Sequence, residues 1–180
     1  RMISSFGPAL KIELKEVKNN KQNHPHLLDI ATVDGEGNDI PPDSARGMYL
    51  RANQLWHTDG AQAQPPLRLT ALSARVLPPV PPPTEYADMR AAWDALPRKR
   101  QLELEGLRVE HSILWSRSLV GMKETDFSPE TRAARPPVVH PLVRTHPRTG
   151  RKSLYLASHA WRVVGLSFES GRALLDELTE

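Results

Sequence analysis

The sequence predicts a mainly β fold with helical insertions. Short segments rich in apolar and β-branched residues recur between turn-forming residues, and such segments are typical of strands. Two other segments place their apolar residues three and four positions apart, which is typical of amphipathic helices. A cluster of prolines follows the first strand-like segments, and it marks a connection because proline removes a hydrogen-bond donor from a β ladder.

The predicted strands share an apolar run that is bounded by glycine, proline, asparagine or aspartate. Turn residues follow the first of them at 34–38 and separate the last two at 147–150. Residues 9–17 alternate apolar and charged positions, so they fit either a half-buried strand or a short amphipathic helix. The predicted strands are 27–33, 53–59, 67–77, 138–143 and 153–157.

The predicted helices lie in the second half of the chain. Between residues 86 and 107 apolar side chains recur at roughly helical spacing, and Pro97 divides this segment into two short helices. Residues 170–178 predict a further amphipathic helix. The prolines of 78–83 predict a stiff loop, and a binding segment for a polyproline-recognising partner is the alternative.

Composition narrows the class of protein. The 180 residues include 39% hydrophobic and 25% charged residues, which is enough to bury one core and argues against disorder. The net charge of +3 is spread along the chain, so no nucleic-acid partner is expected, although a small anion could still be attracted. No apolar run approaches the ~20 residues that span a bilayer, so no membrane association is expected. The absence of cysteine excludes disulfides and thiolate metal sites, and it fits a cytoplasmic protein.

The triplet His57-Thr58-Asp59 is the candidate metal site. Residues two apart on a strand project from the same face, so this imidazole and this carboxylate could share one ion. Two histidines and one carboxylate on one face of an octahedron leave three positions open, which is the ligand set of non-haem iron(II) oxygenases. The triplet alone is more often a surface or structural pair, so its sequence context has to decide.

That context resembles the taurine/2,4-dichlorophenoxyacetate family of Fe(II)- and 2-oxoglutarate-dependent dioxygenases. The matching segments keep the order and spacing of the family from residue 53 onward, and they are more similar to its aryloxyalkanoate branch than to its taurine branch. They are Asn53-Gln54-Leu55-Trp56-His57-Thr58-Asp59, residues 72–79, residues 84–97, Leu104-Glu105-Gly106-Leu107, His140-Pro141-Leu142-Val143-Arg144-Thr145-His146-Pro147 and residues 150–155.

The resemblance implies a fold and a set of ligands. The fold is a double-stranded β-helix, or jelly roll, formed as one dioxygenase domain over residues 1–180, with part of the family pattern missing at both ends. The cofactor is Fe(II), bound by His57, Asp59 and a distal histidine that is not visible in this sequence, with 2-oxoglutarate and O2 as co-substrates. Thr84 would donate a hydrogen bond to a carboxylate of 2-oxoglutarate. The sequence departs from the family just before it, with Pro81-Pro82-Pro83 in place of Gly-Gly-Asp.

Other histidines are weaker candidates. His111 and His159 could line the cavity and contact the substrate carboxylate, although an unassigned histidine is more often a surface or satisfied core residue. Two further pairs, His140 with Arg151 and His159 with Arg172, imitate the spacing of the distal histidine and its arginine. They fall in segments that resemble the region upstream of the distal site, so neither pair is predicted to bind the metal.

The resemblance implies an enzyme that hydroxylates a small organic acid. The expected substrate is an aryloxyalkanoate such as 2,4-dichlorophenoxyacetate or a phenoxypropionate, and the expected products are a phenol, succinate and CO2. The alternatives are a non-catalytic or fragmentary jelly-roll member that binds small acids, a taurine or sulfonate dioxygenase, and an unrelated jelly-roll binding module. Substrate identity follows variable loops, and a homo-oligomer is left open.

Overall fold

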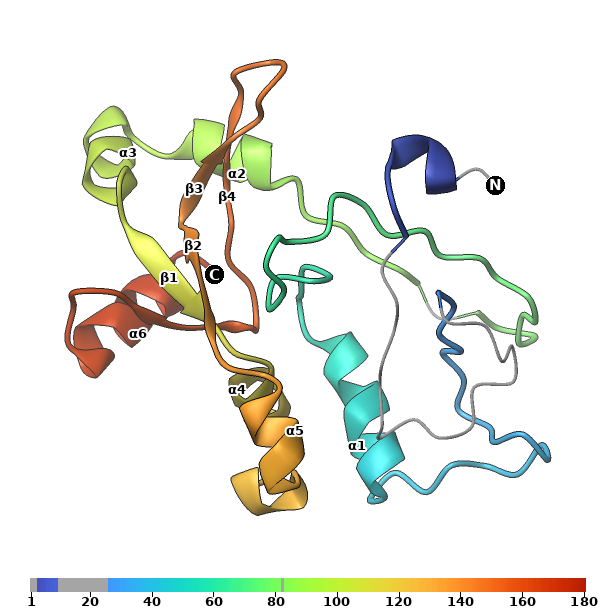
Figure 1. Ribbon diagram of the computed structural model, residues 1–180. Coiled ribbons are helices and arrows are strands. Elements are labelled where there is room, and N and C mark those ends of the chain that lie inside the picture. Colours follow the sequence, from blue (N-terminus) through green and yellow to red (C-terminus); the bar gives the residue numbers. More distant parts are fainter. Residues whose placement is uncertain (1–2, 10–25, 82) are drawn as a thin grey trace.

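The computed structural model describes residues 3–9, 26–81 and 83–180 (Figure 1). The expected strand or helix at 9–17 therefore lies, apart from Ala9, outside the described residues. Both sheets and most helices are formed by the second half of the chain. Among the described residues, no helix is long and apolar enough to cross a bilayer.

A small antiparallel sheet organises the second half of the chain. Its three strands are β1 (Arg108–His111), β2 (Val138–Pro141) and β5 (Ala160–Val163), in the order β2-β1-β5. Val109 of β1 pairs with His140 on one side and with Val163 on the other. A separate hairpin joins β3 (Val143–Thr145) to β4 (Lys152–Leu154) around the turn that the sequence predicts at 147–150.

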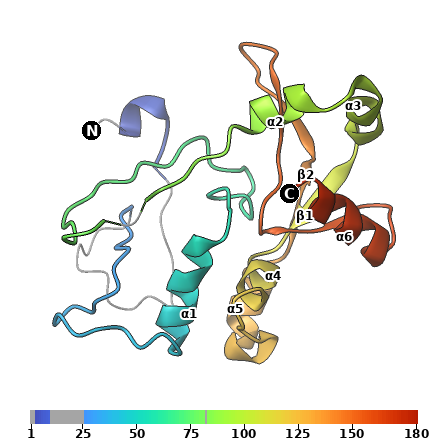
Figure 2. The same cartoon turned by 180° about the vertical axis from the view of Figure 1, so that it is seen from behind.

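Three helices contribute to the core beneath these sheets, and all three follow the sequence prediction. They are α2 (Met89–Ala95), α3 (Arg98–Leu104) and α6 (Phe168–Glu177). Asp88 caps α2 by accepting from the amides of Arg90 and Ala91, and Pro97 separates α2 from α3. Helix α2 contacts β4, and α6 contacts β5; Figure 2 shows α6 from behind, against the sheet. The core consists of Trp93, Leu104, Val109, Leu142, Leu154, Leu156, Ala160, Val163 and Leu175.

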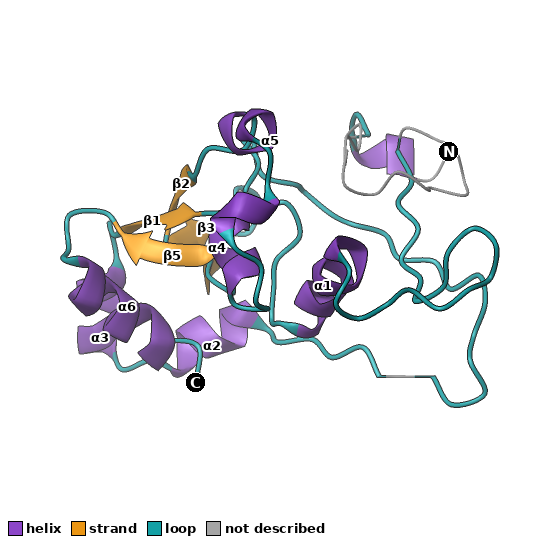
Figure 3. Cartoon of the chain, turned by 90° about the horizontal axis from the view of Figure 1, so that it is seen from below, coloured by secondary structure: helices purple, strands orange, loops and turns teal. Residues whose placement is uncertain are grey.

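The first half of the chain has little regular structure in the part that is described. It contains η1 (Ile3–Phe6), α1 (Ala45–Arg51) and η2 (Ala52–Gln54). Beyond η2 no helix or strand is described before Met89. The segment 78–83 is irregular where it is described, as the prolines predict. Figure 3 shows these loops extending away from the sheets.

The predicted strands at 27–33, 53–59 and 67–77 are wrong in this structure. The first contributes only an isolated bridge between Val33 and Asp39, around the turn that the sequence predicts at 34–38. The other two form no ladder in the described residues. A segment with strand composition forms a strand only where a second strand pairs with it over several residues. In the described chain these segments make only single backbone contacts of that kind, such as the Val33–Asp39 bridge and the hydrogen bond from Ser158 to Trp56.

Two shorter helices complete the fold between β1 and β2. They are α4 (Ile113–Ser118) and α5 (Pro129–Ala133), with the single turn η3 (Glu124–Asp126) between them. Ser112 follows β1 directly and caps α4 by accepting from the amide of Trp115. In Figures 1, 2 and 3 these helices lie next to α1. The described residues contain both sheets and helices, but the helices are longer than the five short strands, so the mainly β class is not confirmed here. The double-stranded β-helix itself stays a prediction.

Candidate metal centre

His57 and Asp59 lie in an extended segment that follows η2 and ends in a turn at Asp59. They are not on a strand, so the expected reason for their alignment is wrong. Their side chains nevertheless meet, with His57 Nε2 3.5 Å from Asp59 Oδ1. One hydrogen bond ties the segment to the second half of the chain, from the amide of Ser158 to the carbonyl oxygen of Trp56 at 3.0 Å.

The orientation of the His57 ring follows from its backbone contact. Nδ1 lies 2.7 Å from the carbonyl oxygen of Leu55. A carbonyl oxygen can only accept, so Nδ1 donates and carries the proton. In the neutral ring this leaves the lone pair on Nε2, the nitrogen that faces Asp59. A fixed tautomer of this kind is what metal-binding histidines ordinarily have.

Each member of the pair favours the charged form of the other. The contact with Asp59 raises the pKa of His57, against the opposing effect of partial burial. His57 in turn lowers the pKa of Asp59, and the Thr70 hydroxyl adds to that effect. The carboxylate is therefore ionised near neutral pH and available to a cation.

Gly60 shapes the turn that follows Asp59. Its φ is +71°, a left-handed conformation that glycine adopts without strain, and an added Cβ would lie 2.3 Å from Cγ of Leu67. Ala61, the next residue, is fully buried. The carboxylate of Asp59 therefore stands beside a turn that only glycine can make at this position.

The donor set of this pair suits iron(II). One imidazole nitrogen and one carboxylate oxygen supply two of the three protein ligands that a facial triad needs. No group of three or more histidine, cysteine, aspartate or glutamate side chains in the described residues is close enough to hold a metal ion. The structure thus brings together the two predicted ligands and no third.

Thr84, the residue predicted to bind 2-oxoglutarate, makes no described contact with His57 or Asp59. It is exposed and lies in the irregular segment before α2. The described residues show no hydrogen bond between its hydroxyl and His57 or Asp59. The role of Thr84 in binding 2-oxoglutarate stays a prediction.

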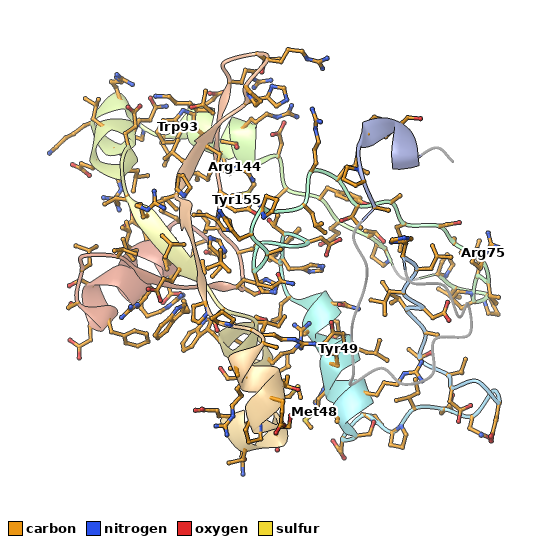
Figure 4. All side chains as sticks on the ribbon, viewed as in Figure 1. Met48, Tyr49, Arg75, Trp93, Arg144 and Tyr155 are labelled. Atoms are coloured by element: carbon orange, nitrogen blue, oxygen red, sulfur yellow. The ribbon has the colours of Figure 1, made fainter. Side chains whose placement is uncertain are left out.

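His111 belongs to a buried cluster of rings. Its ring centroid lies 5.4 Å from that of His140 and 5.3 Å from that of Tyr155, and these two lie 5.5 Å apart. The guanidinium of Arg144 covers the Tyr155 ring at 4.4 Å, and Figure 4 shows the two side chains together. Neither nitrogen of His111 has a hydrogen-bond partner, and burial lowers its pKa to about 3.

The ring cluster reaches the turn after Asp59 through His140. Burial lowers the pKa of His140, and hydrogen bonding to the backbone of Ala61 and Ala63 opposes that effect. Tyr155 is not among the site residues that the sequence predicts, and His140 is predicted not to bind the metal. Register with β1 and burial, which no local pattern reveals, are what place His140 in the cluster.

His159 is the predicted substrate residue that is associated with the metal pair. It precedes β5, is 6% exposed, and its carbonyl oxygen accepts from the amide of Ser112 at 2.8 Å. Burial lowers the pKa of His159 to about 4, helped by the charges of Arg117 and His57 and opposed by Asp59. His159 is therefore neutral near pH 7 and electrostatically coupled to the pair.

Arg151 and Arg172, which have the spacing of the distal arginine relative to His140 and His159, both bind other groups. Arg151 donates to the Asp94 carboxylate at 3.1 Å. Arg172 donates to the Asp176 carboxylate and, at 2.6 Å, to the carbonyl oxygen of Ala160. Neither guanidinium is directed to a carboxylate-binding position beside His57 and Asp59.

Comparison with known proteins identifies the class to which this fold and this site belong. The model of the family described as taurine catabolism dioxygenase TauD, TfdA family, matches residues 1–180. The chain belongs to this family, and an unrelated jelly-roll binding module is excluded.

Three individual relatives show which members of the family the chain resembles. The alpha-ketoglutarate-dependent 2,4-dichlorophenoxyacetate dioxygenase of Cupriavidus pinatubonensis is 47% identical over 180 residues, 98% of this chain and 61% of the relative. The (S)-phenoxypropionate/alpha-ketoglutarate-dioxygenase of Sphingobium herbicidovorans is 35% identical, over 73% of this chain and 47% of the relative. AAD-2, whose crystal structure holds Mn(II) and N-oxalylglycine, superposes with a TM-score of 0.78 at 40% identity, over 84% of this chain and 54% of AAD-2. The chain thus spans about half to three fifths of the length of these relatives.

Proposed function

We propose that the protein is an Fe(II)- and 2-oxoglutarate-dependent dioxygenase that hydroxylates a small aryloxyalkanoic acid. The observation that carries this proposal is the pairing of His57 Nε2 with the Asp59 carboxylate, with the His57 ring held by the Leu55 carbonyl. The pair is the one to which the resemblance to the family assigns the metal, and the relatives of the chain are named for 2,4-dichlorophenoxyacetate and phenoxypropionate.

The residues divide the work as follows. His57 and Asp59 bind the ion, and a distal histidine completes the set. Thr84 donates to a carboxylate of 2-oxoglutarate, while His111 and His159 line the substrate side. The ion, with 2-oxoglutarate and O2, supplies the oxidising power that places one oxygen atom in a substrate C–H bond and the other in succinate. A phenoxyacetate hydroxylated beside its ether oxygen is a hemiacetal, which breaks down to a phenol and glyoxylate.

His111 and His159 suit a dry cavity because both are buried and neutral. A neutral imidazole can donate one hydrogen bond to a carboxylate without adding charge. The larger architecture is proposed as one jelly-roll domain over residues 1–180, as in the family, in a cytoplasmic protein. Reactivity toward taurine or another sulfonate is the second candidate, because the family includes taurine dioxygenases by description.

Thr84→Val is expected to raise the concentration of 2-oxoglutarate that gives half-maximal rate. Losing one hydrogen bond to a charged oxygen costs about 1.5–3 kcal/mol, or about ten- to a hundredfold in affinity. The rate at saturating 2-oxoglutarate should change less, since the hydroxyl is not a metal ligand. Succinate release titrated with 2-oxoglutarate measures both quantities, with Thr70→Val, beside Asp59, as a comparison. An unchanged requirement would remove Thr84 from the site.

The proposed substrate class is tested by a panel of acids. We expect succinate and phenol release to be fastest with 2,4-dichlorophenoxyacetate or a 2-phenoxypropionate and slowest with taurine, because an aromatic acid can use both an apolar wall and a carboxylate-binding group. Preference for taurine would contradict the branch assignment. Binding of these acids with no succinate release from any of them would instead support a non-catalytic acid-binding member.

A further inference from the structure

Arg117, in the last turn of α4, is a buried cation without a counter-ion. The residue is 6% exposed. No carboxylate in the described residues forms an ion pair with it, its Nε has no hydrogen-bond partner, and one guanidinium nitrogen donates to the Ser116 hydroxyl at 3.3 Å. The remaining contact is with Tyr49 of α1, whose ring centroid lies 4.2 Å from the guanidinium carbon. Figure 4 labels Tyr49 on the helix that neighbours α4.

A buried guanidinium in this state is costly. Burying a charge without a paired and hydrogen-bonded counter-ion carries a desolvation cost that one weak hydrogen bond does not offset. Stacking on an aromatic ring returns only about 0.5–2 kcal/mol. Two other arginines near β5 do form ion pairs, Arg162 with Glu110 and Arg172 with Asp176. Arg117 is therefore poised to bind an anion that the described chain does not provide.

Backbone hydrogen bonds connect helix α4, which carries Arg117, to the segment that carries His57 and Asp59. Ser112, which caps α4, donates its amide to the carbonyl oxygen of His159. Ser158, the residue before His159, donates its amide to the carbonyl oxygen of Trp56, the residue before His57. His159 also has a buried Nδ1 without a hydrogen-bond partner. Two buried nitrogens without a hydrogen-bond partner in the described residues, Arg117 Nε and His159 Nδ1, thus lie on segments that backbone hydrogen bonds connect to the His57–Asp59 segment.

We propose that Arg117 binds the carboxylate of the acid substrate, with Tyr49 holding the guanidinium in place and His159 supplying a neighbouring hydrogen-bond donor. This assignment rests on the proposed function. The planar guanidinium can bind both carboxylate oxygens at once, which a lysine ammonium cannot do. Arg117 has no direct contact with His57 or Asp59 in the described structure, so the carboxylate that it binds is not that of the metal ligand Asp59.

The test compares Arg117→Met, Arg117→Lys and wild-type protein loaded with Fe(II). For Arg117→Met we expect the KM for 2,4-dichlorophenoxyacetate to rise about ten- to a hundredfold, as for loss of a hydrogen bond to a charged group. The KM for 2-oxoglutarate should stay the same, and Arg117→Lys should recover part of the loss. Anaerobic calorimetric titration should show the same weakening for the acid and none for the neutral 2,4-dichlorophenoxyethanol. This binding readout does not depend on turnover.

The melting temperature separates a binding role of Arg117 from a purely structural one. If Arg117 only stabilised the fold, Arg117→Met would lower the melting temperature of the ligand-free protein. Because Arg117 lacks a counter-ion, Arg117→Met should leave the melting temperature of the ligand-free protein unchanged or raise it. The matched control is Arg172→Met, which removes a guanidinium that stacks on Trp115 but has a carboxylate partner. It should lower the melting temperature and leave the KM for the acid unaltered.

Three results would overturn the inference: equal acid affinity in Arg117→Met and wild type, a rise in the KM for 2-oxoglutarate instead of the acid, or equal weakening of the acid and the neutral alcohol. Failure of the proposed function would look different, because wild-type protein would then release no succinate with any acid.

Discussion

Replacing His57 by alanine is expected to abolish tight iron(II) binding and succinate release, and Asp59→Ala is expected to do the same. Four ligands to structural zinc contribute about 10–16 kcal/mol in total, so one ligand is worth about 2.5–4 kcal/mol, or about seventy- to eight-hundredfold in metal affinity. The fold should survive, because both side chains are partly exposed, at 32% and 50%. Metal affinity by titration and far-ultraviolet circular dichroism measure these two expectations separately.

The control for this experiment is His146→Ala. His146 is an exposed histidine at the β3–β4 turn, where it contacts Thr149, and it has no place in the proposed site. It should bind iron and turn over 2-oxoglutarate as the parent does. If His57→Ala bound iron as tightly as His146→Ala and released succinate at the same rate, the metal assignment would be wrong.

The protein is expected to lose stability at pH values well above those at which carboxylates titrate. Burial lowers the pKa of His111 to about 3 and that of His159 to about 4, whereas an unfolded histidine titrates near 6.5. Their contribution to stability is therefore complete above about pH 6.5 and is lost as the pH falls toward the folded values, because the unfolded chain then binds more protons. At about pH 5 each group should cost about 2 kcal/mol of the free energy of unfolding, or roughly 4 kcal/mol together.

Urea unfolding at about pH 7.5 and about pH 5 measures this difference. The variant His111→Gln should shrink the gap between the two pH values by about 2 kcal/mol, whatever its own effect on stability at pH 7.5. His159→Gln should act in the same way, and the double variant should remove most of the gap. A wild-type protein that is equally stable at both pH values would show that the two rings are not held neutral.

The sequence by itself determined three of the helices in the second half, α2, α3 and α6, but not the short helices α4 and α5. Helical spacing of apolar residues, the Asp88 cap and Pro97 between α2 and α3 are local signals, because helix hydrogen bonds join residues four apart. The same is true of the turns at 34–38 and 147–150. The His57-Thr58-Asp59 motif is equally local, and its context in the chain was enough to indicate the family that the comparison establishes.

Only the tertiary structure decided which apolar segments pair as strands and which buried groups surround the site. Residues 27–33, 53–59 and 67–77 have strand composition, but a strand also needs a paired strand, which can be far away in sequence. In the described chain these segments form no ladder beyond the isolated Val33–Asp39 bridge. The role of Arg117 could not be predicted for the same reason, because the sequence around a single arginine in a short helix does not show what the side chain contacts. Its burial against Tyr49 and its lack of a counter-ion depend on helices that are more than sixty residues apart, α1 and α4.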